Sequence, residues 1–111
     1  MLPPSVRIFV CTAPQDMRRS FDGLALATTQ VLDEDPRSGA LFVFVSRRRN
    51  RAKVLWWDRN GYCLLCKRLH RALFALPQPK DDTSAAVRID GAALATLLAG
   101  VEKVRATREK S

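Results

Sequence analysis

The sequence lacks the features that mark membrane, secreted and nucleotide-hydrolysing proteins. No apolar run approaches the roughly 20 residues that a helix needs to cross a bilayer, and the N-terminus has no charged start followed by a long apolar stretch. Three cysteines are an odd number for a disulfide framework. No glycine-rich phosphate loop is present. We therefore expect a cytoplasmic protein with no membrane partner.

Residues for catalysis and metal binding are also scarce. The chain has enough potential ligands for a zinc site in Cys63, Cys66, His70 and Cys11. The expected geometry argues against such a site, because residues three apart on a strand point to opposite faces. The adjacent acids at 33–35 follow a predicted helix, where solvated charge is the usual role. We expect no metal, no cofactor and no catalytic residue. A small metal-dependent nuclease, which would need clustered carboxylates, is kept as an alternative.

The feature that is present in excess is positive charge. The 111 residues include 19 Lys and Arg against 11 Asp and Glu, a formal net charge of +8. Between Arg37 and Arg71 there are ten basic residues and one acid, Asp58, so this block carries +9 and the rest of the chain carries −1. A concentrated block produces a local field that attracts phosphates. The charge pattern therefore favours a polyanionic partner.

The apolar periodicity predicts an α+β fold with a small mixed or antiparallel sheet. Three strands within about 41–69 are expected to form an antiparallel meander. Helices are expected at about 17–33 and 91–100. Gly23 in the first helix indicates either a close packing contact or a helix that begins near Asp22. We assign residues 1–101 to a single domain and residues 102–111 to a charged, flexible tail.

Capping residues and apolar runs define the individual elements. Asp16 and Asp90 are the expected N-caps of the two helices. Met17 is expected on the apolar face of the first helix, and Val101 on that of the second. The continuous apolar run Leu41–Val45 is typical of a strand that is buried on both faces. Outside the meander, short strands are expected at Val6–Cys11, Leu73–Leu76 and Val87–Ile89.

Asn60-Gly61 is the strongest turn signal in the chain, because both residues tolerate the positive φ angles of a type I′ turn. A two-residue turn at this position places Trp57 opposite Leu64 and Lys53 opposite Arg68. Like charges that are directly opposed weaken a sheet unless an anion lies between them. The predicted register therefore also points to an anionic ligand.

The basic residues of this meander form the candidate nucleic-acid site. The arginines between the first two strands of the meander would bind phosphates, and the basic residues that follow would lengthen this phosphate-binding surface. Trp57 would stack on a base or pack in the core. Such contacts predict weak sequence specificity and a steep salt dependence. The alternative is a solvated positive face. The predicted contact residues are Arg47, Arg48, Arg49, Arg51, Lys53, Trp57, Lys67, Arg68 and Arg71.

Four blocks of the sequence carry a family resemblance. They are Asp16–Leu24, Leu41–Phe44, Lys53–Asp58 with Gly61, and Cys66–Leu69. In these blocks the chain resembles the TnpB accessory protein of the insertion-sequence-66 family of transposable elements, which is not the RNA-guided nuclease of the same name. The resemblance runs through most of the chain, and the first block is its most specific part.

The resemblance implies a role in transposition, a form of DNA recombination, beside a separate transposase that carries out the strand chemistry. It supplies no catalytic residue. We therefore expect an accessory protein that binds nucleic acid, DNA rather than RNA, through the basic hairpin. The alternative is a protein–protein adaptor whose basic hairpin docks on the transposase of the same element.

Overall fold

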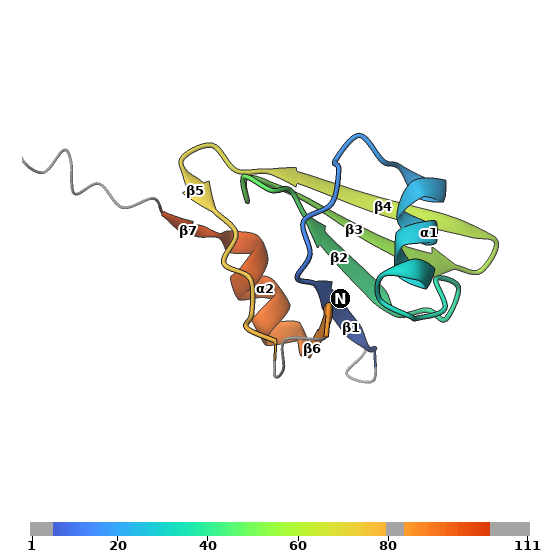
Figure 1. Cartoon of the computed structure of the whole chain (residues 1–111). Helices are drawn as coiled ribbons and strands as arrows, with labels where there is room; N and C mark the ends of the chain where they lie inside the picture. Colours follow the sequence, from blue (N-terminus) through green and yellow to red (C-terminus); the bar gives the residue numbers. More distant parts are fainter. Residues whose placement is uncertain (1–5, 80–83, 103–111) are drawn as a thin grey trace, which may run out of the picture.

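The computed structural model describes residues 6–79 and 84–102, which form two helices and two sheets (Figure 1). The elements in chain order are β1 (Ile8–Cys11), α1 (Phe21–Gln30), β2 (Leu41–Val45), β3 (Arg51–Asp58), β4 (Gly61–Arg68), β5 (Ala72–Leu73), β6 (Ala86–Ile89), α2 (Gly91–Ala99) and β7 (Val101–Glu102). This architecture confirms the predicted α+β class. The predicted tail lies outside the described residues from 103 onward. Neither helix of the described ranges is long and apolar enough to cross a membrane.

The main sheet has five strands in the order β4-β3-β2-β1-β6. β1 and β2 are parallel, and α1 lies between them in the chain, while all other neighbouring strands are antiparallel. The sheet is therefore mixed, and the predicted meander β2–β3–β4 is confirmed. The expected edge strand is also confirmed as β6. The predicted strand at Leu73–Leu76 is wrong beyond Leu73, because the Phe74 N–H donates to the Arg49 carbonyl (2.7 Å) instead of continuing a ladder.

The core consists of two apolar layers on the two faces of the sheet. All five residues of β2 are buried, as predicted from the continuous apolar run. Phe42 and Phe44 pack on one face in a cluster that includes Leu24 of α1. The alternate residues of β2 pack on the other face in a cluster with Leu94 and Leu97 of α2. Each helix therefore covers a different face of the central strands.

The first helix is shorter than the predicted range of about 17–33, and its start agrees with the alternative near Asp22. The carboxylate of Asp16 accepts a hydrogen bond from the backbone N–H of Arg18 (2.9 Å), so it stabilises a local turn and does not cap a helix. α1 begins four residues beyond Met17, with Ser20 at the N-cap. It ends at Gln30, and Asp33 has a positive φ of 56° that a helix cannot accommodate.

The second helix agrees closely with its prediction. The side chain of Asp90 caps α2 by accepting a hydrogen bond from the backbone N–H of Ala93 (2.8 Å). Leu94 and Leu97 are buried, as expected for the apolar face. Val101 is not on that face, because the helix ends at Ala99 and Val101 pairs with β5 in the small sheet.

The predicted register of the β3–β4 hairpin is wrong. Each residue of β3 pairs with a residue of β4 that lies two positions earlier than predicted. Arg59 and Asn60 form the turn, and Gly61 pairs with Asp58 as the first residue of β4. Only Arg59 of the two turn residues has a positive φ (57°). The observed register places the Trp57 ring edge-on against the Tyr62 ring, with centroids 5.0 Å apart, a pairing that adds to strand stability.

Candidate nucleic-acid interface

The β2–β3 connection is a tight turn whose arginine side chains are exposed. The backbone N–H of Ser46 donates to the carbonyl of Arg51 (2.9 Å), and that of Arg49 donates to the carbonyl of Ser46 (2.9 Å). Arg49 has a positive φ of 61°. These bonds satisfy the backbone of the turn locally. The side chains of Arg47, Arg48 and Arg49 are therefore available to solvent or to a ligand.

The chain returns to this turn after β4. The backbone N–H of Leu69 donates to the carbonyl of Asn50 (2.8 Å), and Phe74 donates to the carbonyl of Arg49 (2.7 Å). Leu69 and Phe74 are buried beneath the segment that they hold in place. In Figure 1 the β2–β3 turn and the end of β4 lie at the same end of the sheet, away from the β3–β4 turn.

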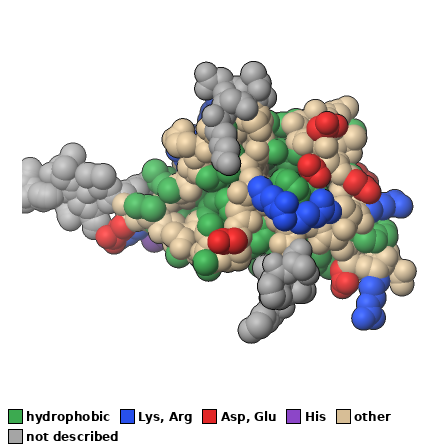
Figure 2. Space-filling model, turned by 90° about the horizontal axis from the view of Figure 1, so that it is seen from below, with side chains coloured by type: hydrophobic (Ala, Val, Ile, Leu, Met, Phe, Trp, Pro, Cys, Tyr) green, Lys and Arg blue, Asp and Glu red, His purple; other side chains and the backbone are tan. Residues whose placement is uncertain are grey.

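This arrangement collects exposed arginines from two parts of the chain. Arg51 and Arg68 are direct partners across β3 and β4, so the sheet opposes two like charges at this end. We call the set the basic end; its members are Arg47, Arg48, Arg49, Arg51, Arg68 and Arg71. By contrast, the face of the molecule drawn in Figure 2 carries acidic as well as basic side chains among hydrophobic ones. The basic end thus brings arginines from two segments of the chain to one end of the sheet.

Two adjoining hollows extend from the basic end across the sheet, and we call them together the basic groove. The larger has a volume of about 650 Å³. It is lined by Asp16, Met17, Arg18, Ser46, Arg47, Arg48, Asn50 and Arg51. The smaller has a volume of about 200 Å³. It is lined by Met17, Arg51, Ala52, Lys53, Cys66, Lys67 and Arg68. The half-buried Met17 lines both, and the loop before α1 forms one wall.

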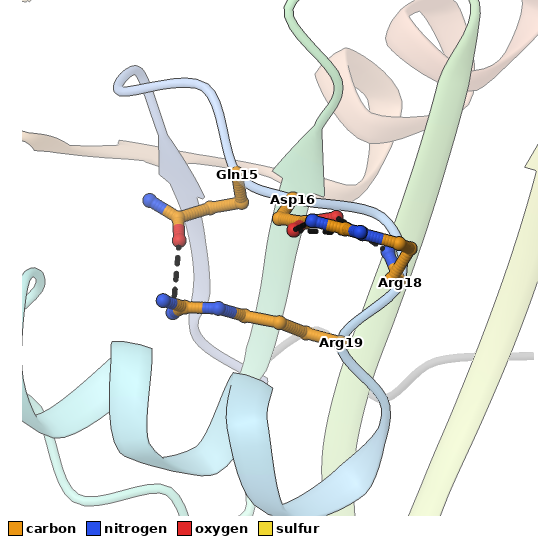
Figure 3. Close-up of polar contacts among 4 residues, drawn as sticks. All are labelled: Gln15, Asp16, Arg18 and Arg19. Atoms are coloured by element: carbon orange, nitrogen blue, oxygen red, sulfur yellow. Dashed lines mark hydrogen bonds and ion pairs between the residues drawn. The ribbon is translucent and has the colours of Figure 1, made fainter.

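The loop before α1 contributes cations that are not among the predicted contact residues. Figure 3 shows the Arg18 guanidinium against the Asp16 carboxylate, with Nη2 donating to Oδ2 at 2.7 Å and Nε to Oδ1 at 3.1 Å. The neighbouring Arg19 donates to the Gln15 side-chain oxygen (3.4 Å). The adjacent pair of arginines in the most specific family block was the signal that could have found them.

Among the described residues that line the larger hollow, Asp16 is the one with an acidic side chain. Hydrogen bonds from Arg18 lower the pKa of Asp16 from 3.8 to about 2. The same contact raises the pKa of Arg18. Asp16 is thus ionised at neutral pH, and its charge is compensated by a guanidinium in direct contact. The groove therefore keeps a positive balance.

This contact predicts a specific pH response of the loop. Because the folded pKa of Asp16 is depressed, the stabilisation by the Asp16–Arg18 contact is fully present above about pH 4 and is lost as the pH falls through about 2. An NMR titration of the side-chain carboxyl carbon should give a midpoint near 2. In the Arg18→Gln variant the midpoint should move towards 3.8. A native midpoint already near 3.8 would show that the contact is absent in solution.

Three predicted contact residues are not part of the basic end. The Lys53 ammonium donates to the carbonyl of Arg19 (2.7 Å) and so ties the loop to β3. Lys67 borders the smaller hollow, but the pleat directs its side chain to the face opposite that of Arg68. Trp57 lies six residues along β3 from Arg51, a distance of about 20 Å. Its ring is covered by the guanidinium of Arg37, 4.7 Å from the ring centroid.

The role of Lys53 leads to a second prediction. Replacement of Lys53 by Met removes a charged hydrogen bond and should lower the free energy of unfolding by about 1 kcal/mol, as measured by urea denaturation. The salt dependence of nucleic-acid binding should change little, because this ammonium is already engaged by the protein. Lys67→Met, an exposed lysine on the other face, is the control and should leave stability unchanged. An unaltered stability of the Lys53 variant would contradict the tether.

The cysteines are separated by the fold. Cys63 and Cys66 lie on opposite faces of β4. Cys11 is buried on β1, where its thiol donates to the carbonyl of Ala13 (3.3 Å), and burial raises the pKa of this thiol. In the two described ranges no three His, Cys, Asp or Glu side chains come together as a metal site.

A family model described as "IS66 Orf2 like protein" matches residues 6–108. The chain belongs to this family. The stated resemblance to the TnpB accessory protein is thereby confirmed, and the family relates the chain to transposition by IS66 elements in an accessory role.

Two relatives of this IS66 Orf2-like protein come from Sinorhizobium fredii (strain NBRC 101917 / NGR234). "Uncharacterized protein y4hO" is 40% identical over 104 residues, covering 92% of this chain and 88% of that protein. "Uncharacterized protein y4jC" is 34% identical over 111 residues, covering 98% and 92%. No solved structure gives a significant match.

Proposed function

We propose that this IS66 accessory protein binds the sugar–phosphate backbone of nucleic acid in its basic groove and leaves strand cleavage and joining to the transposase. The proposal rests on the basic end, which has six exposed arginines. Four of them, Arg47, Arg48, Arg51 and Arg68, line the groove. DNA is the proposed polymer, because transposition acts on DNA.

The chemistry of the groove supports a phosphate ligand. Guanidinium groups bind phosphate through paired N–H donors, and such charge-assisted bonds are stronger than neutral ones. The Asp16 carboxylate is already paired with Arg18. A phosphate in the groove would therefore meet arginine side chains that have no hydrogen-bond partner within residues 6–79 and 84–102, and no opposing free carboxylate from those ranges. It would also relieve the repulsion between Arg51 and Arg68, which face each other across the sheet.

The position of Trp57 argues for backbone contact without base stacking. The ring lies about 20 Å from Arg51 along β3, and Arg37 and Tyr62 occupy its surroundings. The described lining of the groove has no aromatic side chain. Phosphate contacts position a protein on DNA and carry no sequence information. We therefore propose binding with little preference for sequence.

An electrophoretic shift series tests this function. The terminal sequences of the element and a random duplex of the same length are each titrated with the protein at low and at moderate salt. We expect similar affinities for the two duplexes and a loss of affinity of at least tenfold between the salt concentrations. An absence of binding at low salt would contradict the proposal. A transposase complex that survives nuclease treatment, with no binding to either duplex, would favour the adaptor function instead.

A further inference from the structure

β4 is a long edge strand with a free side. It spans eight residues, Gly61–Arg68, and is the last strand in the sheet order, pairing only with β3 among the described residues. Leu65 and Cys66, at its centre, are exposed, and Leu65 is 43% exposed. A strand of this length and composition is a template for pairing with another strand.

The register of the hairpin identifies which backbone groups are free. In an antiparallel pair, directly opposite residues alternate between those that exchange hydrogen bonds and those that do not. The Leu69 N–H donates to the Asn50 carbonyl, in line with the register that pairs Gly61 with Asp58. The odd-numbered residues of β4 are therefore bonded to β3. The N–H and C=O groups of the even-numbered residues point away from the sheet; these residues are Tyr62, Leu64, Cys66 and Arg68.

We propose that two copies of the chain pair edge to edge through β4, antiparallel, about a two-fold axis at Leu65. A two-fold axis relating antiparallel neighbours must be perpendicular to the sheet, so opposite residues lie on the same face. The register centred on Leu65 pairs all four outward-facing residues, Leu64 with Cys66 and Tyr62 with Arg68 of the second copy. Any other two-fold register leaves at least one of them without a partner.

The side chains of β4 fit this register. The exposed Leu65 lies opposite Leu65 of the second copy as a non-hydrogen-bonded pair. Side chains are closest together in pairs of this kind. Lys67 then lies opposite Cys63, and Arg68 opposite Tyr62. Within β4 no cation faces a cation, whereas a parallel pairing would place like charges side by side. The strand thus has an uncharged centre and a basic end that meets the neutral end of the other copy.

The pairing has a consequence that rests on the proposed function. Because the axis is perpendicular to the sheet, both basic grooves would lie on one face of a ten-stranded sheet. The two Arg68 residues would be six residues apart along the strands, about 20 Å. One DNA duplex could then contact both grooves.

The first test compares two changes at one position. Cys66→Pro removes an outward-facing N–H and no bond to β3, which is where an edge strand tolerates proline, while Cys66→Ser keeps the N–H. Sedimentation velocity without nucleic acid should show the native chain and the serine variant approaching twice the monomer mass with rising concentration. The proline variant should stay monomeric. A native chain that is monomeric at every concentration would overturn the proposal. Any strand that pairs with the free edge of β4 would then have to come from another protein.

The second test does not depend on how well the proline variant folds. In a chain with Cys63→Ser and Cys66→Ser, Leu65→Cys should form a covalent dimer under mild oxidation, because its two copies face each other across the axis. Lys67→Cys is the matched control on the same face. Its two copies would be about 13 Å apart along the strands and should not cross-link. Equal cross-linking of both variants would contradict the register. Neither test involves DNA, so a failure here is separate from a failure of the proposed function.

Discussion

Replacement of Arg47, Arg48 and Arg51 by glutamine will lower the affinity for duplex DNA about 100-fold at 0.1 M salt. These arginines line the larger hollow. Each phosphate contact that is lost reduces the slope of log affinity against log salt by about 0.9, so the slope should become shallower by about 2.7. Arg49 is left in place because its positive φ makes the turn sensitive to substitution. Fluorescence anisotropy over a salt series measures both quantities.

A control with the same net charge separates a site from a general charge effect. Arg37, Arg59 and Arg88 are exposed and do not line the groove. Their replacement by glutamine should change the slope by less than one. Equal losses of affinity in both triple variants would mean that DNA binding depends only on the total charge of the protein. Unaltered binding in the first variant would contradict the basic groove as the binding site.

Replacement of Phe42 by alanine will remove most of the free energy of unfolding at 25 °C. The side chain is fully buried on the central strand β2, and its ring stacks on that of Phe9 with centroids 5.8 Å apart. Truncation of a buried phenylalanine costs about 3 to 5 kcal/mol. That is comparable with the whole stability of a small domain, which starts at about 5 kcal/mol. Circular dichroism with urea denaturation measures the loss.

Phe21→Ala is the matched control for this change. The Phe21 side chain is 43% exposed at the start of α1, so its truncation should cost less than about 1 kcal/mol. Equal destabilisation by the two changes would show that the apolar layer beneath α1 is not organised around β2. Because β2 leads directly into the arginine turn, DNA binding should be lost in parallel with folding in the Phe42 variant only.

Much of the fold could be predicted because local signals and burial agree. The uninterrupted apolar run of β2 requires burial on both faces, and the structure has it there. Asp90 caps α2 because its side chain reaches the N–H of Ala93. The meander follows from three β-type runs with short connections. In each case one physical factor decides the outcome.

The errors arise where two local factors compete. Asp16 could cap a helix or close a turn, and Arg18, two residues further on, favours the turn by donating both backbone and side-chain hydrogen bonds. Asn60-Gly61 has the best turn residues, but the packing of Trp57 on Tyr62 favours a register in which Gly61 pairs as a strand residue. Propensity alone cannot rank such alternatives, because the deciding contacts are made by side chains elsewhere.

The sequence predicted the positive charge of the candidate site, but it did not predict where the individual side chains lie. The arginines of the β2–β3 turn and the end of β4 do lie together, because the turn connects adjacent antiparallel strands. Strand alternation separates Lys67 from Arg68, and a tertiary contact engages Lys53. Arg18 joins the groove only through the loop that Lys53 holds. The positions of these side chains depend on the pleat of the strands and on long-range contacts. Neither can be predicted from the amino-acid composition.

An NMR titration of the protein with a short random duplex tests the central claim most directly. If the basic groove holds the DNA backbone, the largest amide shifts will fall at residues 46–51, 67–71 and 16–19, and they will disappear at high salt. The β3–β4 turn around Arg59, which is equally exposed and also basic, should be unaffected. Shifts centred on that turn, or no shifts at low salt, would contradict direct DNA binding by the basic groove.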